Sequence, residues 1–295
     1  MESRFLESLI AVVDYGSISA AARHQNLTPG AVAQRIQTLE EEIGAKLIER
    51  SGRRAHATEA GVQVIKNARP ILQAIRELPT LITHKSISGT IRIGAIGTAL
   101  TGLLPPILKE LSVSCPDLDI YIELGESKGL YRQLMARELD CGFFVQPDFK
   151  LPKMCERFIL RQEPLVVLAS AALDQSDPHE VLASQPFIRY DRNSWGGRLA
   201  DAYLQRHEIA PHERFELDAL DAIAVLVDRG LGVSLVPDWQ QPWPAGIKVK
   251  KLPLPDASVT RQIGLYWLRS SPWDSVIQMM IAAGENGNAK RLAGG

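Results

Sequence analysis

The chain has 295 residues and a formal net charge of -1, with 33 Lys and Arg residues against 34 Asp and Glu residues. This length is sufficient for two domains with separate hydrophobic cores, and the balanced charge excludes a protein that is basic throughout. No stretch has the apolar length needed to cross a bilayer, and the N-terminus lacks a secretion signal, so we expect no membrane partner and a cytoplasmic location. The three cysteines, which have no metal-like spacing, are typical of a reducing compartment.

Three short helices are predicted at the N-terminus. Residues 2–15 carry an apolar face and predict a bracing helix. Ala20, Ala21 and Ala22 are small helix formers that allow close packing of a neighbouring helix. Thr28 is suited to cap the third helix and Pro29 to occupy its first position.

The third helix combines an apolar stripe with a polar face. Val32, Ile36 and Leu39 recur at spacings of four and three residues, which predicts one buried side. The residues predicted to face solvent are Gln34, Arg35, Gln37 and Thr38. Such side chains can read base edges in a major groove, and the helix N-terminus can meet a phosphate. The pattern predicts a helix-turn-helix motif that binds double-stranded DNA.

A basic hairpin is predicted directly after this motif. Residues 46–49 indicate a short strand, residues 50–54 a tip, and residues 55–58 a returning strand. Arg50, Arg53 and Arg54 at the tip could enter a narrow minor groove, as in the wing of a winged helix-turn-helix. The alternative is a solvent-exposed turn whose cluster of charged residues does not contact DNA.

Residues 59–84 predict a long helix. Its apolar stripe has no covering domain and therefore predicts a partner helix, most simply that of a second subunit. The stripe consists of Val62, Ile65, Ala68, Leu72, Ile75, Leu78 and Ile82. Pro70 and Pro79 predict kinks, or an end of the helix before Pro79.

The remainder alternates between strands and helices, which predicts a doubly wound α/β sheet. Strands are expected at residues 90–96, 118–124, 141–145, 165–169, 187–190, 215–217, 233–236 and 262–268, and helices at residues 103–114, 130–137, 199–206, 220–228 and 273–283. A second unit begins near Glu163, and the strand at 262–268 returns to the first unit. The chain thus crosses twice between the two units, which predicts two subdomains joined by a hinge.

The N-terminal run resembles the DNA-binding domain of LysR-type transcriptional regulators. The resemblance is carried by Gly16-Ser17, Ala20-Ala21-Ala22, Thr28, Ala31-Val32, Ile36, Leu39-Glu40, Gly44, Leu47, Glu49-Arg50 and Thr58-Glu59-Ala60-Gly61, in this order and spacing. A second resemblance covers Asp221–Ala224 through Gly230-Leu231-Gly232 to Pro237. Pro29-Gly30 and Ala33 depart from the family's usual residues, which favours Gln34 and Arg35 for base reading.

The resemblance implies an overall architecture. We expect an α/β protein with a winged helix-turn-helix domain at 1–58, a linker dimerisation helix at 59–86 and a periplasmic-binding-protein-like effector domain at 87–295. Subdomain I would comprise 87–162 and 268–295, and subdomain II would comprise 163–267. The implied partners are DNA with partly palindromic half-sites, a small-molecule effector, a homodimer or homotetramer, and RNA polymerase.

Two sets of contact residues follow. The residues expected to contact DNA are Ser17, Thr28, Pro29, Gly30, Gln34, Arg35, Thr38, Arg50, Arg53 and Arg54. Ligands of open α/β sheets bind at the carboxyl ends of strands, and the resemblance adds the opposing segments near 191–195 and 218–219. The residues expected to contact the effector are Thr98, Ala99, Leu100, Thr101, Glu126, Ser127, Gln146, Asn193, Trp195 and Asp218.

The chemistry of the effector stays open at this point. Free N–H groups near Thr101 favour an anion, whereas Glu126 favours an amine-bearing or neutral ligand. Thr98 and Ser127 could equally be ordinary helix caps.

Other functions are weighed against the regulator. Residues 94–98 lack the third glycine of a dinucleotide site and the ending of a phosphate loop, and no hydrolase or zinc-protease motif occurs. We therefore expect no cofactor, no metal site and no catalysis. The alternatives are a small-molecule carrier, an enzyme acting on a phosphorylated metabolite and, through the cysteines, a redox sensor; Cys141 is expected in the core.

Overall fold

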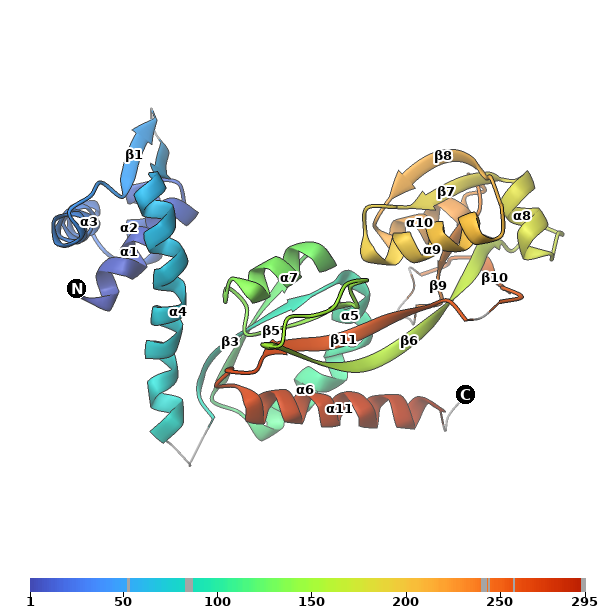
Figure 1. Ribbon diagram of the computed structural model, residues 1–295. Coiled ribbons are helices and arrows are strands. Elements are labelled where there is room, and N and C mark those ends of the chain that lie inside the picture. The colour runs from blue at the N-terminus through green and yellow to red at the C-terminus, as the bar shows by residue number, and fades with distance from the viewer. Residues whose placement is uncertain (52–53, 83–86, 240–242, 244, 257, 293–295) are drawn as a thin grey trace. The chain divides into compact units, whose positions relative to one another are not determined.

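A computed structural model divides the chain into two compact units, Met1–His84 and Lys85–Gly295 (Figure 1). The structure describes residues 1–51, 54–82, 87–239, 243, 245–256 and 258–292. Each unit has its own hydrophobic core and is described by itself.

The first unit is a helical domain with a two-stranded hairpin. Its elements are α1 (Ser3–Asp14), α2 (Ile18–His24), α3 (Pro29–Ile43), β1 (Ile48–Ser51), β2 (Arg54–Ala57) and α4 (Glu59–Ile82). The predicted cap is confirmed, since Oγ1 of Thr28 accepts a hydrogen bond from the N–H of Ala31 at 3.2 Å. The Oγ of Ser17 caps α2 in the same way, through the N–H of Ala20. The α3 helix ends at Ile43 and is followed by its C-cap Gly44, whose φ of 76° is left-handed.

The long helix α4 continues through both prolines to Ile82, so the predicted end before Pro79 is wrong. The prediction of a wholly uncovered stripe is also wrong, because Ala68 and Leu72 are buried in the core of this unit. Ile71 and Ile75 are exposed and share a face, since they lie four residues apart. The side chains of Leu78 and Ile82 lie outside the described residues.

The second unit is a mixed α/β domain. Its helices are α5 (Gly97–Gly102), α6 (Leu104–Ser114), α7 (Ser127–Met135), α8 (Pro178–Ser184), α9 (Trp195–Arg206), α10 (Leu220–Asp228) and α11 (Asp274–Leu292). Its strands are β3 (Gly89–Ala95), β4 (Leu118–Leu124), β5 (Cys141–Val145), β6 (Cys155–Ser170), β7 (Pro186–Tyr190), β8 (His212–Leu217), β9 (Ser234–Pro237), β10 (Val249–Pro253) and β11 (Thr260–Leu268). The elements α5, α8 and β10 were not predicted; residues 97–101 were expected to form a loop.

One sheet runs through this unit in the order β10-β6-β11-β5-β3-β4, and β9 also pairs with β6. The strands β4, β3 and β5 are parallel, whereas β11 is antiparallel to both β5 and β6. A separate parallel pair, β7 and β8, lies against α9 and α10 (Figure 1). Parallel strands with intervening helices agree with the predicted fold class.

The two subdomains are connected within long strands rather than through loops. The first part of β6, up to Pro164, pairs with β11, and the part from Leu165 to Ser170 pairs with β9 and β10. In Figure 1, β6 and β11 run side by side from one subdomain into the other. Residues before the crossing belong to one core, which contains Leu160, and residues after it to two smaller cores, which contain Leu165 and Val166 respectively.

Among the described helices, none is by itself long and apolar enough to cross a membrane. The pair α1 and α2, bent by 119°, meets the length and composition test together, and both helices contribute to the core of the first unit.

Candidate effector site and DNA-binding surface

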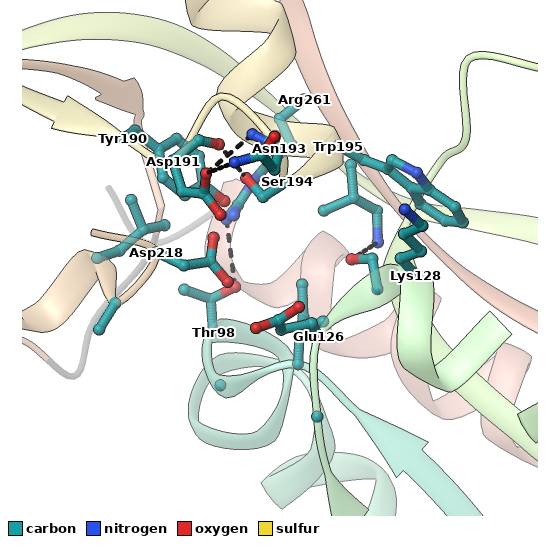
Figure 2. A pocket seen from close by; sticks show the side chains of 18 of the residues that line it. Thr98, Glu126, Lys128, Tyr190, Asp191, Asn193, Ser194, Trp195, Asp218 and Arg261 are labelled. Atoms are coloured by element: carbon teal, nitrogen blue, oxygen red, sulfur yellow. Dashed lines mark hydrogen bonds between the residues drawn. The ribbon is translucent and has the colours of Figure 1, made fainter. Parts of the chain in front are cut away.

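A cavity of about 610 Å³ lies between the two subdomains of the second unit (Figure 2). Subdomain I contributes the ends of β3, β4 and β5 and the start of α7, and subdomain II contributes the segments after β7 and β8. The polar lining residues include Thr98, Glu126, Ser127, Lys128, Arg132, Tyr190, Asp191, Asn193, Ser194, Asp218, Asp221 and Arg261. The volume falls in the range of small-molecule sites.

Arg261 connects the two sides of this cavity. It lies at the start of β11, and its Nε is 2.8 Å from Oε2 of Glu163 on β6. Its second terminal nitrogen donates to Oγ1 of Thr98 at 3.2 Å. Only 1% of Arg261 and 2% of Glu163 are exposed, so each charge depends on the other for its compensation.

Four acidic residues line this space, Glu126, Asp191, Asp218 and Asp221, and Figure 2 labels the first three. Burial raises the pKa of Asp218, and the charges of Glu126 and Asp191 raise it further; the Ser194 hydroxyl and the charge of Arg261 lower it. The Oδ1 atom of Asp218 is buried and has no hydrogen-bond partner among the described residues. A carboxylate beside a cavity with one oxygen lacking a hydrogen-bond partner is a candidate for a ligand contact.

The segment from Asp191 to Trp195 is held in a fixed conformation. Oδ1 of Asp191 accepts hydrogen bonds from both nitrogens of Asn193 at 2.9 Å. The Oγ of Ser194 caps α9 by accepting from the N–H of Gly197 at 3.0 Å. A Cβ at Gly197 would lie 1.9 Å from the carbonyl oxygen of Asp191, so only glycine permits this close approach.

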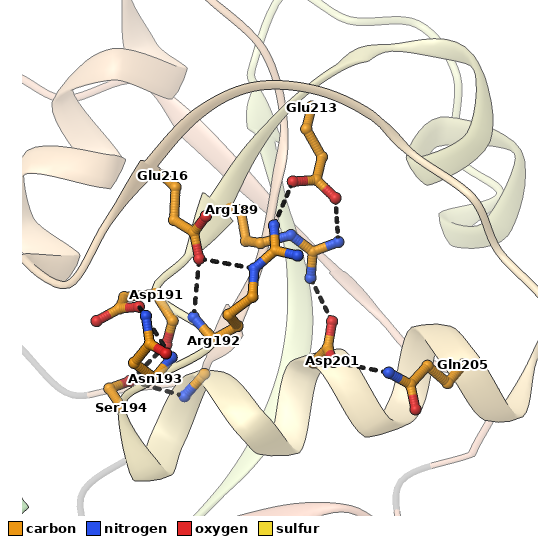
Figure 3. Close-up of polar contacts among 10 residues, drawn as sticks. Arg189, Asp191, Arg192, Asn193, Ser194, Asp201, Gln205, Glu213 and Glu216 are labelled. Carbon is orange, nitrogen blue, oxygen red and sulfur yellow. Dashed lines mark hydrogen bonds and ion pairs between the residues drawn. The ribbon is translucent and has the colours of Figure 1, made fainter.

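An ion-pair network supports this segment from behind (Figure 3). The buried Arg189 pairs with Asp201 of α9 at 2.6 Å and with Glu213 of β8. Arg192 pairs with Glu213 and, at 2.9 Å, with Glu216. These pairs tie β7, β8 and α9 together directly beside the cavity lining.

Six of the ten residues predicted to contact the effector line the cavity: Thr98, Glu126, Ser127, Asn193, Trp195 and Asp218. The other four lie outside this lining. Ala99 is buried in the core of subdomain I, and Leu100 packs against that core. The hydroxyl of Thr101 donates a hydrogen bond to the carbonyl of Gly97. The backbone N–H of Gln146 donates to Gln262 on the neighbouring strand β11. Sequence reasoning missed Tyr190 and Arg261, which also line the cavity.

The start of α3 forms an exposed surface. Thr28, Pro29, Gly30 and Gln34 are exposed, and Thr38 is half-buried, with its hydroxyl bonded to the carbonyl of Gln34. The side chains of Arg50 and Arg54, and all of Arg53, lie outside the described residues.

The prediction that Arg35 and Thr38 face solvent is only partly correct, because both side chains are half-buried. Arg35 is half-buried and donates a hydrogen bond to the Oγ of Ser8 on α1 at 3.3 Å. Ser8 is fully buried and donates in turn to Gln25 at 2.9 Å. Arg35 therefore connects α3 to α1 and α2 instead of extending freely from the surface.

Glu40 fixes the hairpin to α3. Its carboxylate accepts hydrogen bonds from the N–H groups of Leu47 at 2.9 Å and Ile48 at 3.3 Å, and it pairs with Lys46 at 2.6 Å. Burial raises the pKa of Glu40, but these contacts outweigh burial and lower the pKa below its usual value.

The predicted core position of Cys141 is confirmed, and Cys115 and Cys155 are also buried, free thiols. Burial raises the pKa of all three, that of Cys141 well above its ordinary value and that of Cys155 to about 11. No group of three or more His, Cys, Asp or Glu side chains that could hold a metal ion occurs among the described residues.

Comparison with known families decides the identity. A family model described as "LysR substrate binding domain" matches residues 84–284, and one described as "Bacterial regulatory helix-turn-helix protein, lysR family" matches residues 3–62. The chain belongs to the LysR family. It is therefore a sequence-specific DNA-binding transcriptional regulator, controlled by a small-molecule effector bound between its two α/β subdomains.

Individual LysR-type relatives agree with this assignment. The HTH-type transcriptional regulator CzcR of Bacillus cereus is 28% identical over 238 residues, which cover 80% of each chain. A full-length OxyR variant from Pseudomonas aeruginosa has a similar fold, with a TM-score of 0.73, 21% identity and coverage of 96% of this chain and 94% of that chain. CbnR complexed with its target DNA gives a TM-score of 0.66, 18% identity and coverage of 97% and 100%.

Proposed function

We propose that this LysR-type regulator contacts DNA through the N-terminal half of α3 and the tip of the β1–β2 hairpin. The exposed start of α3 is the observation that carries this proposal. Thr28, Pro29 and Gly30 are exposed; Pro29 has no N–H and the N–H of Ala31 bonds to Thr28, so the N–H of Gly30 is the helix donor that suits a backbone phosphate here. Gln34 follows on the same exposed side, with an amide that can pair with an adenine edge.

We further propose that the protein works as a homodimer formed along α4. Ile71 and Ile75 are exposed apolar residues on one face of that helix, and a second α4 would bury them. A two-fold dimer presents two copies of α3 and suits partly palindromic half-sites. Assembly into a homotetramer, contact with RNA polymerase, a cytoplasmic location and the absence of catalysis belong to the same proposal.

The effector would bind in the cavity between the subdomains. The residues proposed to contact it are Thr98, Glu126, Ser127, Asn193, Trp195 and Asp218, together with Tyr190 and Arg261. Because Arg261 is hydrogen-bonded to Thr98 and paired with Glu163, a ligand at this point can alter contacts on both sides of the hinge.

A binding-site selection from random double-stranded DNA tests the proposal. The full chain should enrich a partly palindromic sequence, and its affinity should fall steeply with salt. Gln34→Ala should lose about 1–3 kcal/mol of discrimination at one base position of each half-site. Gln63→Ala, which removes an exposed glutamine from α4, is the matched control and should bind like the parent. Failure to enrich any sequence would contradict the proposed reading surface.

A further inference from the structure

Carboxylates from both subdomains meet in the cavity. Glu126 follows β4 in subdomain I, whereas Asp191 and Asp218 follow β7 and β8 in subdomain II (Figure 2). Like charges on opposite sides of a cleft repel each other, and the low polarity of a closing cleft strengthens this repulsion. The carboxylates therefore oppose closure of the subdomains until a positive charge lies between them.

The cations that line the cavity offset these carboxylates only in part. The charge of Arg261 lowers the pKa of Asp218, but Arg261 is paired with Glu163 and also bonds to Thr98 and Tyr190. Lys128 is an exposed residue of α7 and lies beside Trp195, across the cavity from Asp218 (Figure 2). Arg132 is likewise exposed on α7, one turn further from the cleft.

The buried Oδ1 of Asp218 gives independent support. This oxygen has no hydrogen-bond partner among the described residues, although the Ser194 hydroxyl lies against the same carboxylate. A buried carboxylate oxygen costs free energy unless a donor meets it. A ligand N–H group could supply that donor once a small shift of the Asp218 side chain turns this oxygen toward the cavity, which Asp218 lines.

We propose that the effector carries a positively charged nitrogen, as a primary ammonium or guanidinium group, that binds between Glu126 and Asp218. This inference rests on the proposed effector site. The cation removes the repulsion between the subdomains and so favours the closed clamp. Lys128 lies on the far side of the cavity, where it suits a carboxylate at the other end of the ligand.

Thermal unfolding of the full chain tests this inference with defined probes. Arginine, lysine and putrescine form the cationic set, and glutarate and benzoate form the anionic set. At least one cationic probe should raise Tm by several degrees, whereas the anionic probes should not. A larger shift with the amino acids than with putrescine would support the additional contact to Lys128, and an equal shift would support the ammonium contact alone.

Three variants locate the response. Asp218→Asn and Glu126→Gln should each weaken binding of the active probe about tenfold or more, since each removes one charged contact. Asp119→Asn removes the same charge from the exposed strand β4 and should leave the shift unchanged. Glu126 is exposed, so its variant keeps the test valid if Asp218→Asn folds poorly.

Stabilisation by the anionic set alone, or by neither set, would overturn the inference. An ammonium response that persists in both variants would overturn it as well. DNA binding measured on the same preparation distinguishes failure of this inference from failure of the proposed function. Specific DNA binding together with a response to anions would refute only the cationic effector. Absence of DNA binding would refute the proposed function.

Discussion

Arg261 and Glu163 form a buried ion pair at the point where the strands β11 and β6 pass between the subdomains, with Nε of Arg261 2.8 Å from Oε2 of Glu163. The burial of Tyr190 beside Arg261 raises the pKa of its phenol, so Tyr190 stays neutral at physiological pH. Because the same guanidinium donates to Thr98 in subdomain I, one side chain joins the hinge to the cavity wall. A change at this pair should therefore affect both stability and effector response.

Glu163→Gln should lower the free energy of unfolding by about 3–5 kcal/mol, because it leaves the buried Arg261 uncompensated. The double variant Glu163→Leu with Arg261→Met removes both charges and should recover most of that loss. Urea unfolding measures the free energy of unfolding of both variants. Equal losses of stability in the single and double variants would contradict the ion-pair argument. The double variant should still respond poorly to effector, because Thr98 has lost its hydrogen-bond donor.

Arg35→Ala should destabilise the protein by about 1 kcal/mol, because it removes the hydrogen bond to the buried Ser8. Its affinity for different DNA sequences should fall in equal proportion. Gln34→Ala should change stability by less than about 0.5 kcal/mol and instead alter discrimination between sites. Urea unfolding measures the stability of the two variants, and fluorescence anisotropy measures their affinity for two DNA sequences. A loss of discrimination between these sequences in Arg35→Ala would show that Arg35 reads bases.

The helix-turn-helix could be predicted because its signals are local. Thr28 and Pro29 mark the start of α3, and the apolar spacing of Val32 and Leu39 marks its buried side. The position of Arg35 was mispredicted because a residue three after Val32 and four before Leu39 lies beside that stripe rather than opposite it. A stricter use of the helical period would have found this.

The cavity could be predicted only in part. The strand-end rule and the family resemblance located Thr98, Glu126 and Asp218, but Thr98 and Arg261 lie 163 residues apart and no local pattern connects them. The full length of β6 was missed because its first half lacks a regular alternation and Pro164 interrupts the pattern. Long-range pairing with β11 holds that segment in a strand.

Glu40 should make the first unit sensitive to acid. Its pKa is lowered in the folded state, so its contribution is complete above the unfolded value of 4.5 and disappears as the pH falls through the folded value. Between about pH 5 and pH 3 the parent should therefore lose more stability than Glu40→Gln, which has no charge to titrate. Urea unfolding across this range measures the difference, and Glu41→Gln, an exposed neighbour, is the control. Parallel pH curves for the parent and Glu40→Gln would refute the role of this carboxylate.

The dimer along α4 predicts a strong dependence on one helix face. Ile71→Lys or Ile75→Lys should shift the protein toward monomer and weaken DNA binding, because a charge cannot be buried between two helices without a partner. Val62→Lys is a matched control: Val62 is also exposed but lies nine residues from Ile71, about half a turn around the helix. Analytical ultracentrifugation reads the association. Dissociation by Val62→Lys alone would place the interface on the opposite face.

The cysteines should not sense oxidants. A thiol reacts as its thiolate, and burial raises the pKa of Cys115, Cys141 and Cys155, so little thiolate forms near neutral pH. At pH 8 the folded protein should react with a thiol reagent far more slowly than the urea-unfolded protein, in which all three thiols react. Hydrogen peroxide at low concentration should leave DNA binding unchanged. Two results together would contradict this prediction: one thiol of the folded protein reacts at the unfolded rate, and its Cys→Ser variant abolishes a peroxide-induced change in DNA binding. Burial would then no longer account for the behaviour of that cysteine. The protein would have a redox switch in addition to its effector mechanism.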